Sequence, residues 1–145
     1  MVRYELNYCD LVERQIGVDF HIKETNDDEV IEYCIEMFNS KIKWDGMFDL
    51  AGAKNRIKNG DKLFVGYCDE TVVGYCWMKM IELGNYYLYN VFINEESKNR
   101  KYGATDLSFL IIKNNTCGKI YIDIDEWNKK SQNVAKKLGF KKTII

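Results

Sequence analysis

The chain has 145 residues, with 21 Lys and Arg against 22 Asp and Glu and one His, so its net charge is −1 at pH 7. A chain with balanced charge has no global field to draw it to nucleic acid or an anionic membrane, so we predict neither partner. Hydrophobic residues make up 46% of the sequence, enough for a packed core. The length predicts a single domain over residues 1–145, in which residues 1–17 form an ambiguous N-terminal extension.

The cysteines and the N-terminus bear on localisation. Five cysteines form no CxxC pair and accompany only one His, so we predict no metal site. The first ten residues include acids and lack the apolar stretch of a secretory signal. The longest uncharged stretch, residues 83–94, is shorter than the ~20 residues that span a membrane. We therefore predict a cytoplasmic protein with reduced, buried thiols, Cys117 among them.

The first part of the chain predicts one strand and two helices. Val18–Lys23 alternates apolar and polar residues, which indicates a strand. Asn26 caps a run in which apolar residues recur at helical spacing as far as Phe38. A second helix is predicted over Met47–Asn59, with Gly60 as its stop. His21, the single histidine, lies in the predicted strand and is expected to be structural.

The middle of the chain predicts three strands. Leu63–Cys68 and Val72–Ile81 are rich in β-forming residues and are separated by a three-residue turn. Gly84 and Asn85 then precede a third run, Tyr86–Ile93. Short turns between consecutive strands favour an antiparallel meander.

The last third of the chain alternates helices and strands. Its apolar spacing and caps predict two helices, Lys101–Asn115 and Asn128–Leu138, and two strands, Lys119–Ile124 and Phe140–Ile145. A strand, helix, strand, helix, strand order favours parallel pairing in this half. The whole chain therefore predicts an α/β fold with a mixed sheet.

The turn between Ile93 and the following helix has the composition of an anion-binding loop. Backbone N–H groups at a helix start point outward, and the helix dipole adds partial positive charge there. Gly103 allows close approach to the backbone, and Lys98, Arg100 and Lys101 supply positive charge. Neither GxxxxGK[ST] nor GxGxxG is present. The pattern predicts a phosphate-bearing ligand held mostly by backbone amides.

Three motifs between Leu63 and Phe140 follow one another at family-like intervals. Gly74 follows two apolar residues in the second strand of the first hairpin, and residues 100–105 fit [Q/R]-x-x-G-x-[G/A] except at Thr105. Residues 128–140 follow the spacing N-x-x-[A/S]-x-x-L-Y-x-x-x-G-F. Together they resemble the GNAT (N-acetyltransferase) superfamily. The resemblance implies one domain with a mixed central sheet, an antiparallel meander followed by parallel strands four and five, flanked by about four helices.

The resemblance also implies a cofactor site. In that family, strands four and five, here Tyr86–Ile93 and Lys119–Ile124, splay apart and hold the pantetheine arm of acetyl-CoA. A second register of the phosphate loop, from Lys98 to Gly103, stays open beside the one from Arg100 to Thr105. The cofactor-binding residues implied are Val91, Phe92, Ile93, Arg100, Lys101, Tyr102, Gly103, Ala104, Thr105, Asn128 and Ser131.

The implied reaction is acetyl transfer to a primary amine of a small molecule or peptide, by direct attack of the amine on the thioester. Ala135 stands where many members carry a tyrosine that acts as general acid. Two alternatives therefore stay open: a CoA-binding but inactive regulatory or sensor module, and an interaction domain without a cofactor. The analogy also leaves a homodimer open. Candidate catalytic residues are Tyr89, Asn90 and Asp125, and candidate acceptor-binding residues are Trp44, Phe48 and Tyr87.

Overall fold

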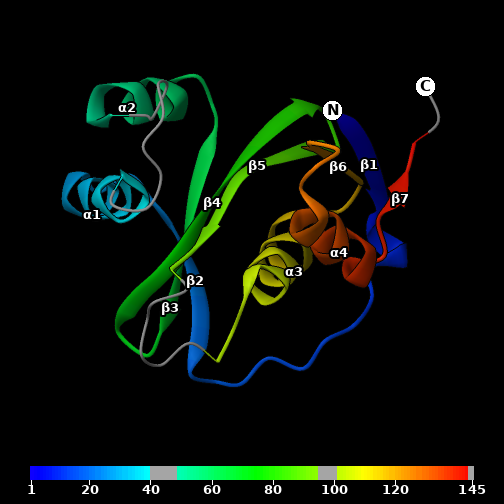
Figure 1. Ribbon diagram of the computed structural model, residues 1–145. Coiled ribbons are helices and arrows are strands. Elements are labelled where there is room, and N and C mark those ends of the chain that lie inside the picture. The colour runs from blue at the N-terminus through cyan, green and yellow to red at the C-terminus, as the bar shows by residue number, and fades with distance from the viewer. Residues whose placement is uncertain (40–48, 95–100, 144–145) are drawn as a thin grey trace.

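The computed structural model describes residues 1–39, 49–94 and 101–143. These residues form one seven-stranded sheet in the order β2-β3-β4-β5-β6-β1-β7, with helices on both faces (Figure 1). In chain order the elements are β1 (Val2–Asn7), η1 (Tyr8–Asp10), β2 (Phe20–Thr25), α1 (Asp28–Asn39), α2 (Leu50–Lys58), β3 (Lys62–Cys68), β4 (Thr71–Glu82), β5 (Asn85–Ile93), α3 (Ala104–Asn115), β6 (Lys119–Ile124), α4 (Lys129–Leu138) and β7 (Lys141–Lys142). Three predicted candidates, Trp44, Phe48 and Arg100, lie outside the described residues.

The predicted meander is confirmed. β3, β4 and β5 pair antiparallel through short turns, and β2 pairs antiparallel with β3 at one edge of the sheet. Asp69 in the first turn has a φ of 52° and Gly84 in the second has a φ of 82°. Both turns thus use the left-handed backbone region that tight hairpin turns require.

The amino-terminal strand changes the topology predicted for the last third. β1 pairs antiparallel with β6, from Val2 opposite Ile124 to Asn7 opposite Lys119. β7 pairs antiparallel with β1 rather than with β6. The expectation of parallel pairing for the final strand is therefore wrong, because β1 occupies the edge of β6 that a parallel final strand would need.

The helix starts show where local side chains satisfy backbone N–H groups. Asp27, not the predicted Asn26, caps α1 by accepting from the N–H groups of Glu29 and Val30, at 2.9 and 3.2 Å. Asp49 caps α2 by accepting from Gly52 at 2.7 Å, so the described helix starts at Leu50. Among the described residues, no helix is long and apolar enough to cross a membrane.

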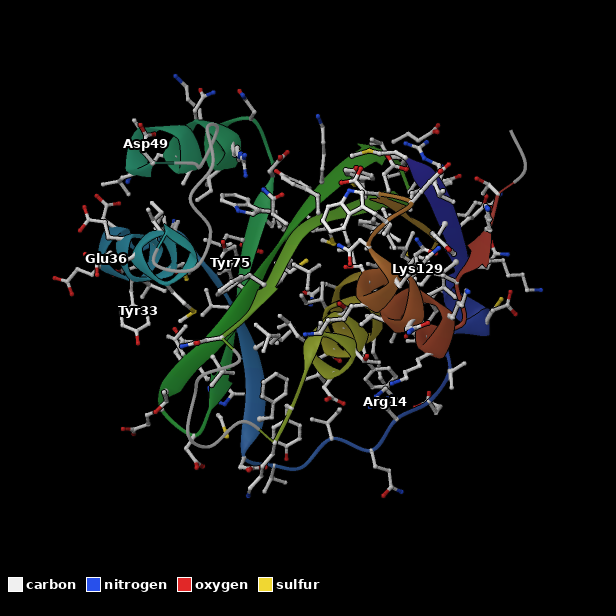
Figure 2. The ribbon with its side chains drawn as sticks, in the orientation of Figure 1. Arg14, Tyr33, Glu36, Asp49, Tyr75 and Lys129 are labelled. Carbon is white, nitrogen blue, oxygen red and sulfur yellow. The ribbon has the colours of Figure 1, made fainter. Side chains whose placement is uncertain are left out.

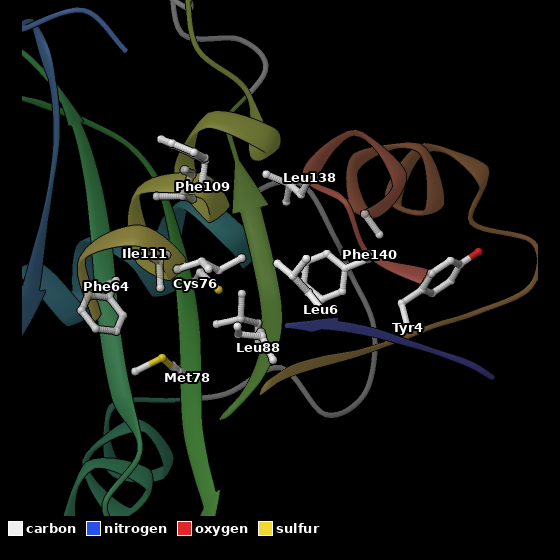
Figure 3. Packing of buried hydrophobic residues seen from close by; sticks show 14 of the residues in the cluster. Tyr4, Leu6, Phe64, Cys76, Met78, Leu88, Phe109, Ile111, Leu138 and Phe140 are labelled. Carbon is white, nitrogen blue, oxygen red and sulfur yellow. The ribbon is translucent and has the colours of Figure 1, made fainter. Parts of the chain in front are cut away.

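Two hydrophobic cores lie on opposite faces of the sheet. α3 and α4 cover one face, and the side chains packed between them and the strands include Leu6, Phe64, Leu88 and Phe109 (Figure 3). α1 and α2 cover the other face (Figure 1). The core on that side consists of Ile31, Cys34, Ala53, Leu63, Val65, Tyr75 and Trp77.

The prediction that the thiols are buried holds for only some of the cysteines. Cys34, Cys68 and Cys76 are buried, whereas Cys9 and Cys117 are exposed. Cys9 lies in η1, and Cys117 lies in the turn between α3 and β6. Short turns run over the surface, which is why the expectation of a buried Cys117 is wrong.

Candidate functional site

The parallel strands β5 and β6 pair only over their first residues. The paired positions run from Asn85 opposite Lys119 to Tyr87 opposite Tyr121. β5 nevertheless continues to Ile93 and β6 continues to Ile124. Beyond Tyr87 and Tyr121, the facing edges of these two described strands are no longer paired, so they diverge. We call this divergence, between residues 88–93 and residues 122–124, the β5–β6 opening. Backbone groups along such an edge require other partners, which an extended ligand can provide.

A bulge bends β5 beside the opening. Tyr75 pairs with Phe92 and Trp77 pairs with Tyr89, so two residues of β5 stand opposite one residue of β4. One of the two, Asn90, has a φ of 52°. Asparagine tolerates this left-handed region better than most residues, and a bulge bends its strand and increases the local twist. The bulge thus accounts for the change in direction of β5 past its paired residues.

The start of α3 offers backbone donors beside open space. Gly103 has an extended backbone with a φ of −119°, and a Cβ placed on it would meet no atom within 4 Å. Neither its conformation nor the packing of the protein therefore requires glycine at this position. The first turn of a helix leaves N–H groups without partners in the helix, and they attract anions. A glycine at this point keeps the approach to those groups clear.

A carboxylate missed in the sequence analysis shares this helix start. Asp106 accepts a hydrogen bond from the N–H of Gly103 at 2.9 Å, and Arg14 lies 2.9 Å from the same carboxylate. Arg14 comes from the long segment between η1 and β2, which passes on the α3 and α4 side of the sheet (Figure 2). An acid three residues after a cap is the spacing of a capping box, and that signal was present in the sequence. The ion pair offsets the negative charge that Asp106 brings to the helix start.

Asp19 engages both side chains that precede Gly103. The Tyr102 hydroxyl donates to Asp19, and the Lys101 ammonium lies 3.4 Å from its other oxygen. The Tyr102 ring also stacks on Phe20, with centroids 4.7 Å apart. The bond to Asp19 raises the pKa of Tyr102 to about 12, and the bond from Tyr102, more than the one from Lys101, lowers the pKa of Asp19. These contacts hold residues 101–102 against β2.

The start of α4 is fixed by amide side chains. Asn128 caps the helix through its oxygen, which accepts from the N–H of Ser131 at 3.1 Å. Gln132 donates to the carbonyls of Asp125 and Glu126, at 3.2 and 2.9 Å. The cap uses only the oxygen of Asn128, so its amide N–H₂ group keeps its donors. The loop that leaves β6 is therefore held in place while Asn128 can still donate a hydrogen bond.

Aromatic rings line the face of β4 and β5 that α1 and α2 cover. Tyr89 stacks between Tyr87 and Trp77, with centroid distances of 5.8 and 6.2 Å. The Arg56 guanidinium lies 5.4 Å from the Tyr89 ring and 5.1 Å from the Trp77 ring. The Tyr89 hydroxyl donates to Asp61. Burial, and then Asp61, raise the pKa of Tyr89, so this phenol stays protonated at neutral pH.

A second carboxylate ties β5, β6 and β1 together. Asp123 accepts from Arg3 Nε at 2.8 Å and Nη2 at 3.0 Å, and from the Tyr87 hydroxyl at 3.1 Å. The bonds from Arg3 lower the pKa of Asp123. No pattern in the sequence indicated the contacts of Arg3 or Asp61, because each residue meets its partner only through the pairing of distant strands.

The network around Asp123 predicts a pH-dependent contribution to stability. A carboxylate whose pKa is lowered on folding stabilises the protein above its usual pKa of ~3.9 and loses that effect as the pH falls through the lowered value. We expect Asp123→Asn to reduce the free energy of unfolding by about 1 kcal/mol at neutral pH, because Arg3 is in contact with water. Urea unfolding at several pH values measures the difference. It should disappear as the pH falls through the lowered pKa of Asp123, and Glu70→Gln in the exposed β3–β4 turn is the control for the loss of a surface carboxylate.

The structure groups the predicted site residues by element. Val91, Phe92 and Ile93 lie on β5 at the opening, together with Asn90 at the bulge. Residues 101–105 form the start of α3, and Asn128 and Ser131 the start of α4. Tyr87 and Tyr89 share one face of β5, and Asp125 follows the end of β6. Their roles toward a ligand stay predictions.

These features define a class of protein. A mixed sheet whose central parallel strands diverge beyond a bulge, with a helix start offering backbone donors, is the framework of the acyl-CoA-dependent acetyltransferases. The sequence model of the Acetyltransferase (GNAT) family matches residues 22–140. The chain belongs to this family, which confirms the resemblance and the fold class predicted from the sequence. Acetyl-CoA is the acyl donor of the family, so the predicted cofactor is confirmed at the level of the family.

Solved structures share the fold at low sequence identity. YncA, a putative acetyltransferase from Salmonella typhimurium solved with its cofactor acetyl-CoA, is 22% identical over 87% of this chain and 82% of its own, with a TM-score of 0.63. An aminoglycoside acetyltransferase from an uncultured soil metagenomic sample, solved with sisomicin, is 13% identical over 88% of this chain and 93% of its own, with a TM-score of 0.65.

The length of a third neighbour differs from that of this chain. The GCN5-related N-acetyltransferase from Kribbella flavida is 11% identical over 97% of this chain, with a TM-score of 0.64. This chain spans only 53% of that protein's length. No curated protein matches the chain.

Proposed function

We propose that this protein is an acetyl-CoA-dependent N-acetyltransferase that acts on a primary amine of a small molecule or peptide. The observation that carries the proposal is the β5–β6 opening, in which pairing stops at Tyr87 and Tyr121 while both strands continue. An opening of this kind suits an extended arm with its own amide groups, which can complete the hydrogen bonding of a strand edge.

The proposed position of acetyl-CoA follows the donors around the opening. The pantetheine arm lies along Val91, Phe92 and Ile93 of β5. The pyrophosphate lies at the start of α3, near the N–H groups of residues 104–106, where Gly103 leaves room. Asn128 donates to the arm through its amide N–H₂ group. A side-chain role of Lys101 in phosphate binding requires its ammonium to leave Asp19.

The proposed chemistry is direct transfer. A backbone N–H of β5 donates to the thioester oxygen, where negative charge develops as the amine attacks. The amine first loses a proton to solvent water, because amines with a pKa near ~10 are mostly protonated at neutral pH. The departing thiolate then takes a proton. Ala135 cannot give one, and we assign this step to Tyr89, which directly precedes the bulge and whose hydroxyl must release Asp61 to donate to the thiolate.

The proposed acceptor is a cationic amine. Tyr87 and Tyr89 present stacked rings on β5, and their hydroxyls are bonded to Asp123 and Asp61. Aromatic rings beside carboxylates attract an ammonium group. The structural neighbour solved with sisomicin is an aminoglycoside acetyltransferase, and an amine acceptor there supports an amine acceptor here.

One observation favours a second function, a CoA-binding module without catalysis. Ala135 is buried in the core beneath α4, with 2% of its surface exposed. The family's usual tyrosine would not fit there without displacing neighbours. The two functions differ in turnover, so release of the CoA thiol with a panel of amines separates them.

Titration of acetyl-CoA tests the cofactor site. We expect isothermal titration to give micromolar binding to the wild type, and the Gly103→Glu variant to bind at least about 100-fold more weakly. The new carboxylate would lie at the helix start where the pyrophosphate is proposed, and like charges there repel. The variant should still fold, since a Cβ at this position meets open space.

Asn133→Glu provides the matched control. It adds the same charge at an exposed position of α4 and should leave acetyl-CoA binding unchanged. Absence of binding by the wild type would contradict both functions above. Equal weakening in the two variants would show that overall charge, and not the start of α3, controls binding.

A further inference from the structure

Two exposed cysteines, Cys9 and Cys117, flank the end of the β1–β6 ladder. The last paired residues are Asn7 and Lys119. The next step is also bonded, because the N–H of Tyr8 donates to the carbonyl of Gly118 at 2.9 Å. One residue further on each side are Cys9 and Cys117. Cys9 belongs to η1 and Cys117 to the turn before β6, so the end of the ladder places in one region two thiols that are 108 positions apart in the sequence.

Both thiols open onto one surface cavity. Cys9 and Cys117 line a cavity of about 440 Å³ together with Tyr8, Asn85 and Tyr121. Each of the two is exposed, so a dissolved reagent can reach them. The Cys117 side chain is also a hydrogen-bond partner of Tyr86.

The remaining thiols are set apart by burial. Cys34, Cys68 and Cys76 are buried. Burial raises the pKa of Cys34 to about 12, so almost none of its thiolate is present at neutral pH. The thiolate is the nucleophile in thiol chemistry, and reaction is therefore expected at the exposed pair.

We propose that Cys9 and Cys117 form a dithiol site that exchanges with small-molecule disulfides and closes to an intramolecular disulfide. A disulfide requires Cα atoms ~4.4–6.8 Å apart, so its closure brings η1, which holds Cys9, against the turn that holds Cys117. Both elements directly follow the last bonded step of the β1–β6 ladder, at Tyr8 and Gly118. The proposed class of reactant is a small-molecule disulfide, for which glutathione disulfide is the probe.

The exchange balances in two steps. The thiolate of one cysteine attacks a sulfur of glutathione disulfide, which forms a mixed disulfide and releases one glutathione thiolate that takes up a proton. The thiolate of the other cysteine then attacks the protein sulfur of the mixed disulfide and releases a second glutathione. The protein loses two hydrogens in total, and the small-molecule disulfide is reduced to two thiols. Excess reduced thiol reverses both steps.

The bond would fix one end of the β5–β6 opening. Cys117 immediately precedes Gly118 and β6, and Asn85, which lines the same cavity, pairs with Lys119 at the first step of the parallel pairing. The disulfide would therefore tie η1 to the closed end of the opening. It would leave the cofactor positions at the far ends of the strands unchanged.

Mass spectrometry of the folded protein after treatment with glutathione disulfide tests the site. We expect the wild type to lose two hydrogens and to carry no glutathione, with tryptic peptides 4–14 and 114–119 joined through their cysteines. Cys9→Ser and Cys117→Ser should each instead accumulate one glutathione adduct, because the resolving thiol is missing. Dithiothreitol should restore the starting mass in all three proteins.

Three results would overturn the proposal. Wild-type protein that keeps two separate glutathione adducts would show that the two thiols cannot meet. A covalent dimer would place the bond between chains. A wild type that does not react at all, while the unfolded chain reacts at every cysteine, would show that the site is closed to disulfides.

Discussion

Replacing Gly118 with alanine is expected to lower the free energy of unfolding by about 1–3 kcal/mol and to weaken acetyl-CoA binding about tenfold or more. A Cβ on Gly118 would lie 1.7 Å from the carbonyl oxygen of Gly84. That oxygen is a backbone atom and also accepts from the N–H of Lys119 at 3.0 Å, so it cannot move without loss of this bond. The methyl group would push the β4–β5 turn away from the start of β6. Urea unfolding and calorimetric titration of acetyl-CoA measure the two effects.

Gly103→Ala is the matched control for this substitution. The added methyl group meets no atom within 4 Å, and the backbone there is extended, so stability should stay within about 0.5 kcal/mol of the wild type. If Gly118→Ala were equally stable, the contact between the β4–β5 turn and β6 would not hold the strands at the closed end of the opening. If it were destabilised but bound acetyl-CoA normally, the three paired positions would not set the geometry of the opening.

The parts of the fold that were predictable from the sequence are those with local causes. The β3–β4–β5 meander follows from β-forming runs joined by short turns. The end of α4 at Gly139 follows from its left-handed backbone, with a φ of 103°. Such signals act within a few residues of the chain.

The parts that were not predictable depend on distant partners. β1 has no distinctive pattern of its own, and its place beside β6 follows from pairing across more than 100 residues. The bulge depends on Asn90, a residue whose left-handed backbone leaves no mark in the sequence. Exposure of Cys9 and Cys117 depends on where η1 and the turn before β6 lie on the surface.

The candidate site shows the same difference between features with local causes and features that depend on distant partners. The start of α3 was predictable because a glycine, basic residues and a helix cap lie close together in the chain. The engagement of Lys101 and Tyr102 with Asp19 was not, because β2 supplies the carboxylate. The same holds for Tyr89, whose hydroxyl partner, Asp61, lies just before β3.

Tyr89→Phe should lower kcat by about 100-fold to 10,000-fold if Tyr89 gives its proton to the departing thiolate, as we propose. Phenylalanine keeps the ring that stacks between Tyr87 and Trp77 and lies beneath Arg56, and it removes only the hydroxyl. KM for acetyl-CoA should change little, because the proposed cofactor contacts lie on the backbone of residues 91–93 and at the start of α3. Release of the CoA thiol under saturating amine gives both constants.

Tyr87→Phe separates a catalytic hydroxyl from a structural one. Tyr87 stacks on the same ring, and its hydroxyl is likewise bonded to a carboxylate, Asp123. Loss of the Tyr87 hydroxyl should therefore disturb packing and hydrogen bonding as much as loss of the Tyr89 hydroxyl, with a far smaller effect on kcat. Equal losses in the two variants would make both hydroxyls structural. An unchanged kcat in Tyr89→Phe would leave the thiolate to take its proton from water, for which a thiol pKa near ~8.5 makes a dedicated acid dispensable.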